Sequence, residues 1–75
     1  MPLQVKLRDL IAFLAENGWR YKNTEGDHHQ YVHSQITGKV TLVGDRGDDI
    51  GGFLLNSVLH QAGLTPKALR QWLNR

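Results

Sequence analysis

Three histidines crowd one short segment of the chain, and imidazole is the side chain best suited to exchange a proton near neutral pH. They are His28, His29 and His33, and the aromatic and β-branched residues between them favour a strand. Successive side chains of a strand point to opposite faces of its sheet, so His28 shares one face with Gln30. His29 shares the other face with the large Tyr31. Because Tyr31 is the better core residue, we expect His28 and Gln30 to project from an open face.

An exposed histidine can support one demanding reaction, the cleavage of RNA. RNA carries its own nucleophile, the 2′-hydroxyl, and a histidine can take its proton so that the oxygen attacks the adjacent phosphorus. This chemistry uses no metal ion and no cofactor, but nearby cations would hold the phosphate. Arg20 and Lys22 on the preceding predicted strand and Lys39 on the following one are the candidates. Alternation puts Arg20 and Lys22 on one face, although the sequence leaves open whether it is that of His28.

The other histidines and the aromatic residues of this region can each be interpreted as functional or as purely structural. His29 and His33 could hold a metal, but tetrahedral zinc needs three or four ligands and the chain has no cysteine. We therefore predict no metal site and interpret the two histidines as neighbours that flank Tyr31. Trp19, Tyr21 and Tyr31 could stack bases, yet at least two of the three are expected in the core.

Helices are predicted on either side of the histidine segment. Residues 6–17 carry an apolar stripe of helical period, and Gly18 suits the end of that helix. A second helix is predicted over residues 53–62, and Thr65 followed by Pro66 begins a short last one. The expected stripe of the first helix consists of Leu7, Leu10, Ile11 and Leu14, and that of the second of Leu54, Leu55, Val58, Leu59 and Ala62.

Three strands are predicted between the main helices, over residues 19–23, 28–34 and 39–43. The turns between them, residues 24–27 and 35–38, are so short that neighbouring strands must be antiparallel. A polar loop over residues 44–49 then leads to the second helix. The fold class is therefore α+β, in the order α-β-β-β-α with a short C-terminal helix. Helices should cover one face of the three-stranded antiparallel sheet and leave the other open.

The size and composition of the chain fit one small globular domain, residues 1–75. Nine Lys and Arg against seven Asp and Glu give a formal charge of +2, which permits nucleic-acid binding without requiring it. The chain has no cysteine, and no apolar run approaches the roughly 20 residues that span a bilayer. The first residues lack the apolar block of a signal peptide. We expect a cytoplasmic protein without membrane association.

The ordered motifs of the chain resemble those of the HicA family, the toxins of HicA–HicB toxin–antitoxin modules. They are Gly18-Trp19, Gly26-Asp27-His28-His29-Gln30-Tyr31, Val40-Thr41-Leu42, Gly52-Phe53-Leu54 and Leu59-His60-Gln61-Ala62-Gly63-Leu64. The resemblance implies a fold like that of double-stranded-RNA-binding domains and cleavage of mRNA. The family's catalytic histidine, in a Gly-Ser-His motif on the second strand, corresponds to His28. The implied protein partner is a HicB-like antitoxin that covers the site, and Arg20, Lys22, Gln30 and Lys39 are the expected RNA contacts.

Two departures from the family pattern sustain an alternative function. Asp27 replaces the serine before the catalytic histidine, and the loop at residues 44–49 is acidic where the family is commonly basic. Phosphate binding depends on Lys and Arg, so each acidic replacement weakens it. The alternative is a module of the same fold that binds RNA or a protein without cutting, as a divergent or inactive relative of the toxins.

Overall fold

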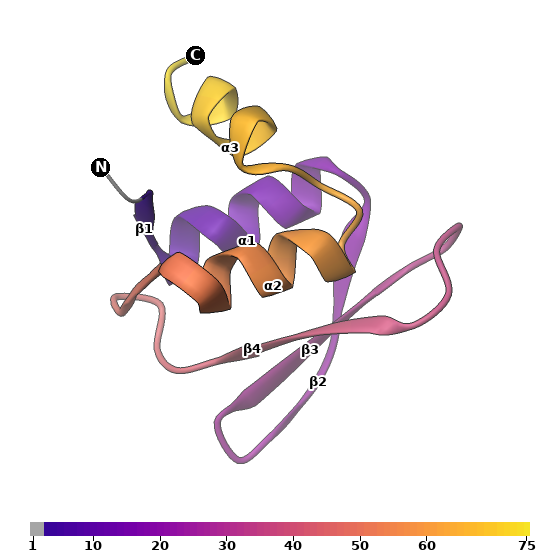
Figure 1. The fold of residues 1–75 in the computed structure, drawn as a ribbon. Helices are drawn as coiled ribbons and strands as arrows, with labels where there is room; N and C mark the ends of the chain where they lie inside the picture. Colours follow the sequence, from indigo (N-terminus) through magenta and orange to yellow (C-terminus); the bar gives the residue numbers. More distant parts are fainter. Residues whose placement is uncertain (1–2) are drawn as a thin grey trace.

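The computed structural model of the chain describes residues 3–75, which form short strands and three helices (Figure 1). The elements are β1 (Gln4–Lys6), α1 (Leu7–Glu16), β2 (Trp19–Glu25), β3 (His28–His33), β4 (Lys39–Val43), β5 (Asp49–Gly51), α2 (Gly52–Gln61) and α3 (Pro66–Leu73). The α+β class, the antiparallel meander and the short last helix are thereby confirmed. Among the described residues, no helix combines the length and apolar character needed to cross a membrane.

The central sheet has the order β2-β3-β4, with both neighbouring pairs antiparallel. Tyr31 faces Tyr21 on one side and Val40 on the other, which places these three residues on one face of the sheet. The pairing of β2 with β3 is interrupted by an irregularity between Tyr21 and Asn23, where Lys22 is the extra residue. The prediction that Arg20 and Lys22 share a face assumed that side chains alternate without interruption along β2. The bulge at Lys22 interrupts this alternation, so the prediction no longer follows.

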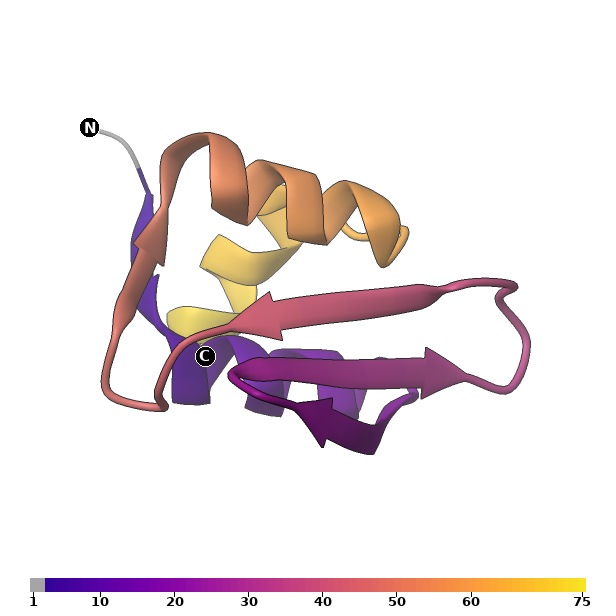
Figure 2. The same cartoon turned by 90° about the horizontal axis from the view of Figure 1, so that it is seen from below.

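Helices α1 and α2 lie on the same side of the three-stranded sheet, and the opposite side has no helix over it (Figures 1 and 2). Helix α1 packs against β2 and α2 against β4. The core between the layers contains the buried stripes of both helices together with Trp19, Tyr31, Val40 and Leu42 from the sheet. The prediction that Leu54 belongs to this core is wrong, since Leu54 is 68% exposed. The buried positions of α2 are Leu55, Val58 and Leu59, and Leu54 is turned away from them.

Strands β1 and β5 form a second, two-stranded sheet that the sequence did not predict. Val5 pairs with Ile50, and Asp49, expected in the loop, is the first residue of β5. The shortened loop, residues 44–48, supplies the cap that α1 lacks in its own side chains. The backbone N–H groups of Leu7 and Arg8 donate to the carbonyl oxygens of Asp48 and Arg46, at 2.8 and 3.0 Å. These bonds satisfy two of the free donors of the first helical turn.

Helix α3 closes the core from the C-terminal side. The Thr65 hydroxyl accepts from the backbone N–H of Ala68, the N-cap predicted from Thr65 and Pro66. Leu69 is fully buried, and the Trp72 ring packs 5.4 Å from that of Phe13. The Trp72 indole N–H also donates to the Glu16 carboxylate at 3.0 Å.

Candidate functional site

His28 is the first residue of β3 and follows directly on the two-residue turn that joins β2 to β3. The predicted four-residue turn is shorter in the structure because Thr24 and Glu25 continue β2 and pair with His29 and His28. On its other side His28 faces Val43 of β4. These pairings place His28 on the face that bears no helix, as alternation predicted.

The side chain of His28 is accessible and has one polar partner. It is 56% exposed, and its Nδ1 lies 3.1 Å from a carboxylate oxygen of Asp27, itself 70% exposed. A carboxylate can only accept, so it places a proton on Nδ1 and, in the neutral ring, leaves Nε2 as a free base facing solvent. Glu25 is the residue paired with His28 across the hairpin, so it adds a second acidic residue on this face.

The expected RNA-contacting cations are not next to His28. Arg20 and Lys39 face Val32 from its two sides, so all three lie on the open face with His28. Val32 is four residues from His28, which is about 13 Å along a strand. Arg20, Lys22 and Lys39 are exposed. Gln30 lies on the same face between the two ends, but only 9% of it is accessible.

The opposite face of the hairpin carries a chain of hydrogen bonds centred on His29. Its Nε2 lies 2.9 Å from the carbonyl oxygen of Gly44, and its Nδ1 lies 3.0 Å from the Thr24 hydroxyl. The Tyr21 hydroxyl lies 2.5 Å from the same Thr24 oxygen. Because the Gly44 carbonyl only accepts, Nε2 donates to it. In the neutral ring Nδ1 then accepts from Thr24, whose oxygen accepts from Tyr21.

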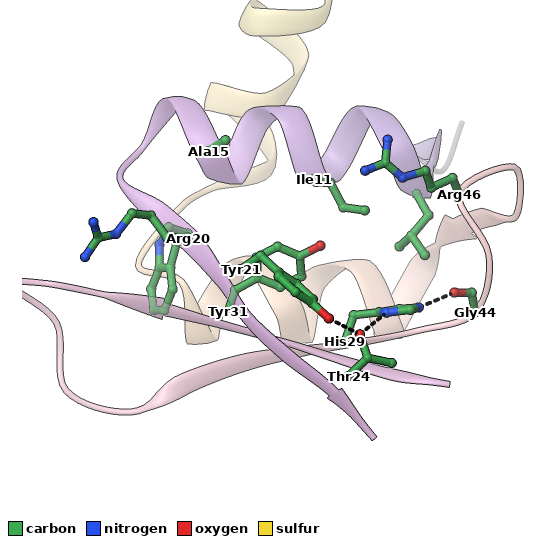
Figure 3. A pocket seen from close by; sticks show the side chains of 11 residues that line it. Ile11, Ala15, Arg20, Tyr21, Thr24, His29, Tyr31, Gly44 and Arg46 are labelled. Atoms are coloured by element: carbon green, nitrogen blue, oxygen red, sulfur yellow. Dashed lines mark hydrogen bonds between the residues drawn. The ribbon is translucent and has the colours of Figure 1, made fainter. Parts of the chain in front are cut away.

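An open cleft of about 580 Å³ lies between α1 and this face of the β2–β3 hairpin (Figure 3). Ile11 and Ala15 of α1 form one wall, and Tyr21, His29 and Tyr31 form the other. The Tyr21 and Tyr31 rings meet edge to face, with centroids 5.8 Å apart. Burial raises the pKa of Tyr31, partly offset by nearby Arg46. In Figure 3, Arg46 lies at the N-terminal end of α1 and Arg20 at the opposite end of the cleft, with its guanidinium directed away from the rings.

The second histidine on this face has a structural role. His33 Nε2 donates to the carbonyl oxygen of Asn17 at 3.0 Å, and Nδ1 accepts from the backbone N–H of Gln35. Both ring nitrogens of His29 and His33 are therefore engaged within the protein. Residues 3–75 contain no group of three or more His, Asp or Glu side chains placed to hold a metal ion.

The sequence predicted the face on which His28 lies but not the cleft on the opposite face. The aromatic residues were weighed as stacking platforms of an open sheet, whereas Trp19 and Tyr31 are buried and Tyr21 is 58% exposed on the helix-covered face. The expectation that at least two of the three lie in the core is confirmed. Arg46 was counted only as part of a polar loop. The one sequence signal for this cleft was the alternation of side chains along a strand. It places Tyr21 on the face opposite Arg20, and His29 on the face opposite His28.

A helix, a three-stranded antiparallel meander and a helix, with both helices on one sheet face, form a small α+β domain whose topology is compatible with that of double-stranded-RNA-binding domains. Residues 7–64 match the family described as HicA toxin of bacterial toxin-antitoxin, and the chain belongs to that family. The match spans α1 to the segment after α2, and α3 lies beyond it. A search of curated proteins finds no match.

Proposed function

We propose that this HicA-family toxin is an RNA endonuclease that cleaves mRNA with His28 as its proton-transfer residue. The observation that carries the proposal is the exposed His28 imidazole on the open sheet face, with Nδ1 held by Asp27 and Nε2 free. Its position on the second strand of the meander is that of the family's catalytic histidine. The partner is a HicB-like antitoxin that covers this face, and the compartment is the cytoplasm, where mRNA is translated.

The proposed reaction uses only the protein, the RNA and solvent water. His28 Nε2 takes the 2′-hydroxyl proton as the oxygen bonds to the adjacent phosphorus. The bond from phosphorus to the 5′ oxygen breaks, and that oxygen takes a proton from solvent. The products carry a 2′,3′-cyclic phosphate and a 5′-hydroxyl. In-line attack needs a backbone free to rotate, so the substrate is single-stranded or locally unpaired.

The RNA contacts follow from the layout of the open face. Arg20 and Lys39 hold a phosphate some 13 Å along the strand from His28, and therefore not the scissile one. Lys22, in the bulge of β2, adds a third cation near them. Gln30 contacts RNA only through the small part of its amide that is exposed.

One observation favours a second function, RNA binding without cleavage. Glu25 and Asp27 are the charged neighbours of His28, and both carry the same sign as a phosphate. Like charges about 4 Å apart repel by about 1 kcal/mol in water. In this alternative the open face binds RNA or a protein through Arg20 and Lys39, and His28 is a solvated strand residue.

The deciding experiment is the incubation of a long RNA with purified protein in excess EDTA, beside His28→Ala. His60→Ala is the matched control, because it removes an exposed imidazole from α2. We expect wild type and His60→Ala to leave 2′,3′-cyclic phosphate ends and His28→Ala to leave the RNA intact. Circular dichroism establishes that all three are folded. Cleavage by His28→Ala overturns the assignment, and binding without cleavage by wild type selects the second function.

A further inference from the structure

The cleft between α1 and the hairpin has the composition of a site for an aromatic anion. Its walls are apolar or aromatic, with Ile11 and Ala15 on one side and Tyr21 and Tyr31 on the other (Figure 3). Arg46, exposed at one end of the cleft, provides positive charge. At about 580 Å³ the cleft falls within the range of small-molecule sites.

The polar groups of the cleft are already oriented. Among its side chains, His29 is fixed by the Gly44 carbonyl and Thr24 by His29. When the His29 ring is neutral, Thr24 donates to His29 and Tyr21 donates to Thr24, which leaves the Tyr21 oxygen able to accept a hydrogen bond from a ligand. Tyr21 is 58% exposed, which leaves ring surface accessible for stacking on a flat molecule. Apolar walls, an accessible ring surface and a fixed acceptor suit a nucleobase better than an aliphatic side chain.

The cleft and the proposed cleavage site lie on opposite faces of the sheet, beside the same edge strand. His28 and His29 are consecutive and point to opposite faces, and β2, the strand they pair with, is an edge strand. Within residues 3–75, no further strand lies beyond β2 at that edge. An RNA strand that bends around β2 can present its backbone to His28 and place a nearby base behind the hairpin.

We propose that this cleft binds one unpaired nucleobase of the RNA, stacked on Tyr21, with the attached phosphate on Arg46. The inference rests on the proposed action on RNA but not on the chemistry of the cut. The base seated there sets which phosphates reach His28, so the cleft determines cleavage-site preference. Tyr21 and Arg46 are specificity residues, and Thr24 and His29 position the Tyr21 hydroxyl.

The test measures binding of RNA that cannot be cut. Two labelled strands of about eight nucleotides, a length within the range of single-strand sites, carry 2′-O-methyl groups. One has bases and the other is abasic throughout, and fluorescence anisotropy gives the Kd of each. We expect wild type to prefer the base-bearing strand at least fivefold, equivalent to about 1 kcal/mol of stacking. Tyr21→Ala abolishes this preference, and Tyr21→Phe, which keeps the ring, retains most of it.

Arg46 is tested against a matched cation on another element. Arg46→Gln and Arg70→Gln remove the same charge, and Arg70 is exposed on α3, outside the cleft. We expect only Arg46→Gln to weaken binding and to reduce the slope of log K against log salt by about one. Equal effects of the two variants overturn the assignment of a phosphate to Arg46.

The remaining outcomes separate this inference from the proposed function. If wild type cuts RNA and Tyr21→Ala keeps both the base preference and the cleavage pattern, the cleft is not a base site and the ribonuclease proposal stands. A base preference that depends on Tyr21, without any cleavage, supports the cleft and refutes the catalytic role of His28. If neither strand is preferred but Tyr21→Ala prevents binding of the antitoxin, the cleft is a protein-docking site and the inference is wrong.

Discussion

The ring of His33 lies directly over Gly18, so that a Cβ on Gly18 would come within 2.6 Å of His33 Nε2. Gly18 has φ of +91°, in the left-handed region, and it joins α1 to β2. The same ring bonds to the carbonyl oxygen of Asn17 and meets the Trp19 ring edge-on, with centroids 5.2 Å apart. This contact therefore fixes the angle at which β2, and with it the hairpin of His28, leaves the helix.

Gly18→Ala should be more destabilising than left-handed geometry alone explains. Gly38→Ala is the control, because Gly38 has nearly the same φ, +95°, with nothing within 4 Å of its Cβ position. We expect Gly38→Ala to lower the free energy of unfolding by about 1 kcal/mol and Gly18→Ala by at least about 2 kcal/mol. Urea denaturation of the two variants measures the difference. Equal losses would mean that the His33 contact relaxes at no cost.

Stability should fall at alkaline pH in a way that depends on Tyr31. Burial raises the pKa of Tyr31 above its ordinary value of 10.0, so the unfolded chain loses this proton at a lower pH than the folded one. The contribution of Tyr31 to the free energy of unfolding is complete at pH values below its ordinary pKa. This contribution is lost as the pH rises through the pKa of Tyr31 in the folded protein. We expect Tyr31→Phe to lose less stability than wild type between about pH 8 and pH 11 in urea titrations. Parallel losses in both proteins contradict the assignment.

Asp27→Asn should tighten RNA binding. The carboxylate that holds His28 Nδ1 also repels phosphates, by about 1 kcal/mol at 4 Å in water, so its neutralisation should lower the Kd for non-cleavable RNA about fivefold. Asp9→Asn, which removes the same charge from α1 behind the sheet, should change the Kd less. A Kd that responds equally to both substitutions would show that only net charge matters.

Trp72→Ala should loosen α3 without altering the hairpin. The indole packs on Phe13 and bonds to Glu16, and the Arg75 guanidinium lies 4.0 Å from the ring centroid. Because Trp72 is only partly buried, we expect a loss of about 2 kcal/mol, below the roughly 3–5 kcal/mol of a fully buried Trp. Thermal unfolding beside Gln71→Ala, an exposed neighbour, gives the comparison. A loss no larger than that of Gln71→Ala would show that Leu69 alone holds α3.

Long periodic segments made most of the fold predictable. Strand β4 was predicted with its observed bounds, and the bounds of α1 and α2 within one residue, because each repeats its pattern over several positions. Strands β1 and β5 have three residues each, too few for a pattern, and their partners lie some 45 residues apart. The face of His28 followed from alternation alone. The cleft could not be predicted, because it arises from how α1 sits over β2, a distance between elements that no local pattern encodes.

The cap on α1 has a consequence for the order in which the molecule can form. The first N–H groups of α1 are bonded to carbonyls of residues 46 and 48, and the strand just before α1 pairs with residues 49–51. During synthesis, these N–H groups lack their protein partners until that distant loop has been made. Such long-range closure slows folding compared with a helix capped by its own neighbours. A nascent chain that stops short of residue 46 thus has neither a finished first helix nor the loop that bounds the cleft.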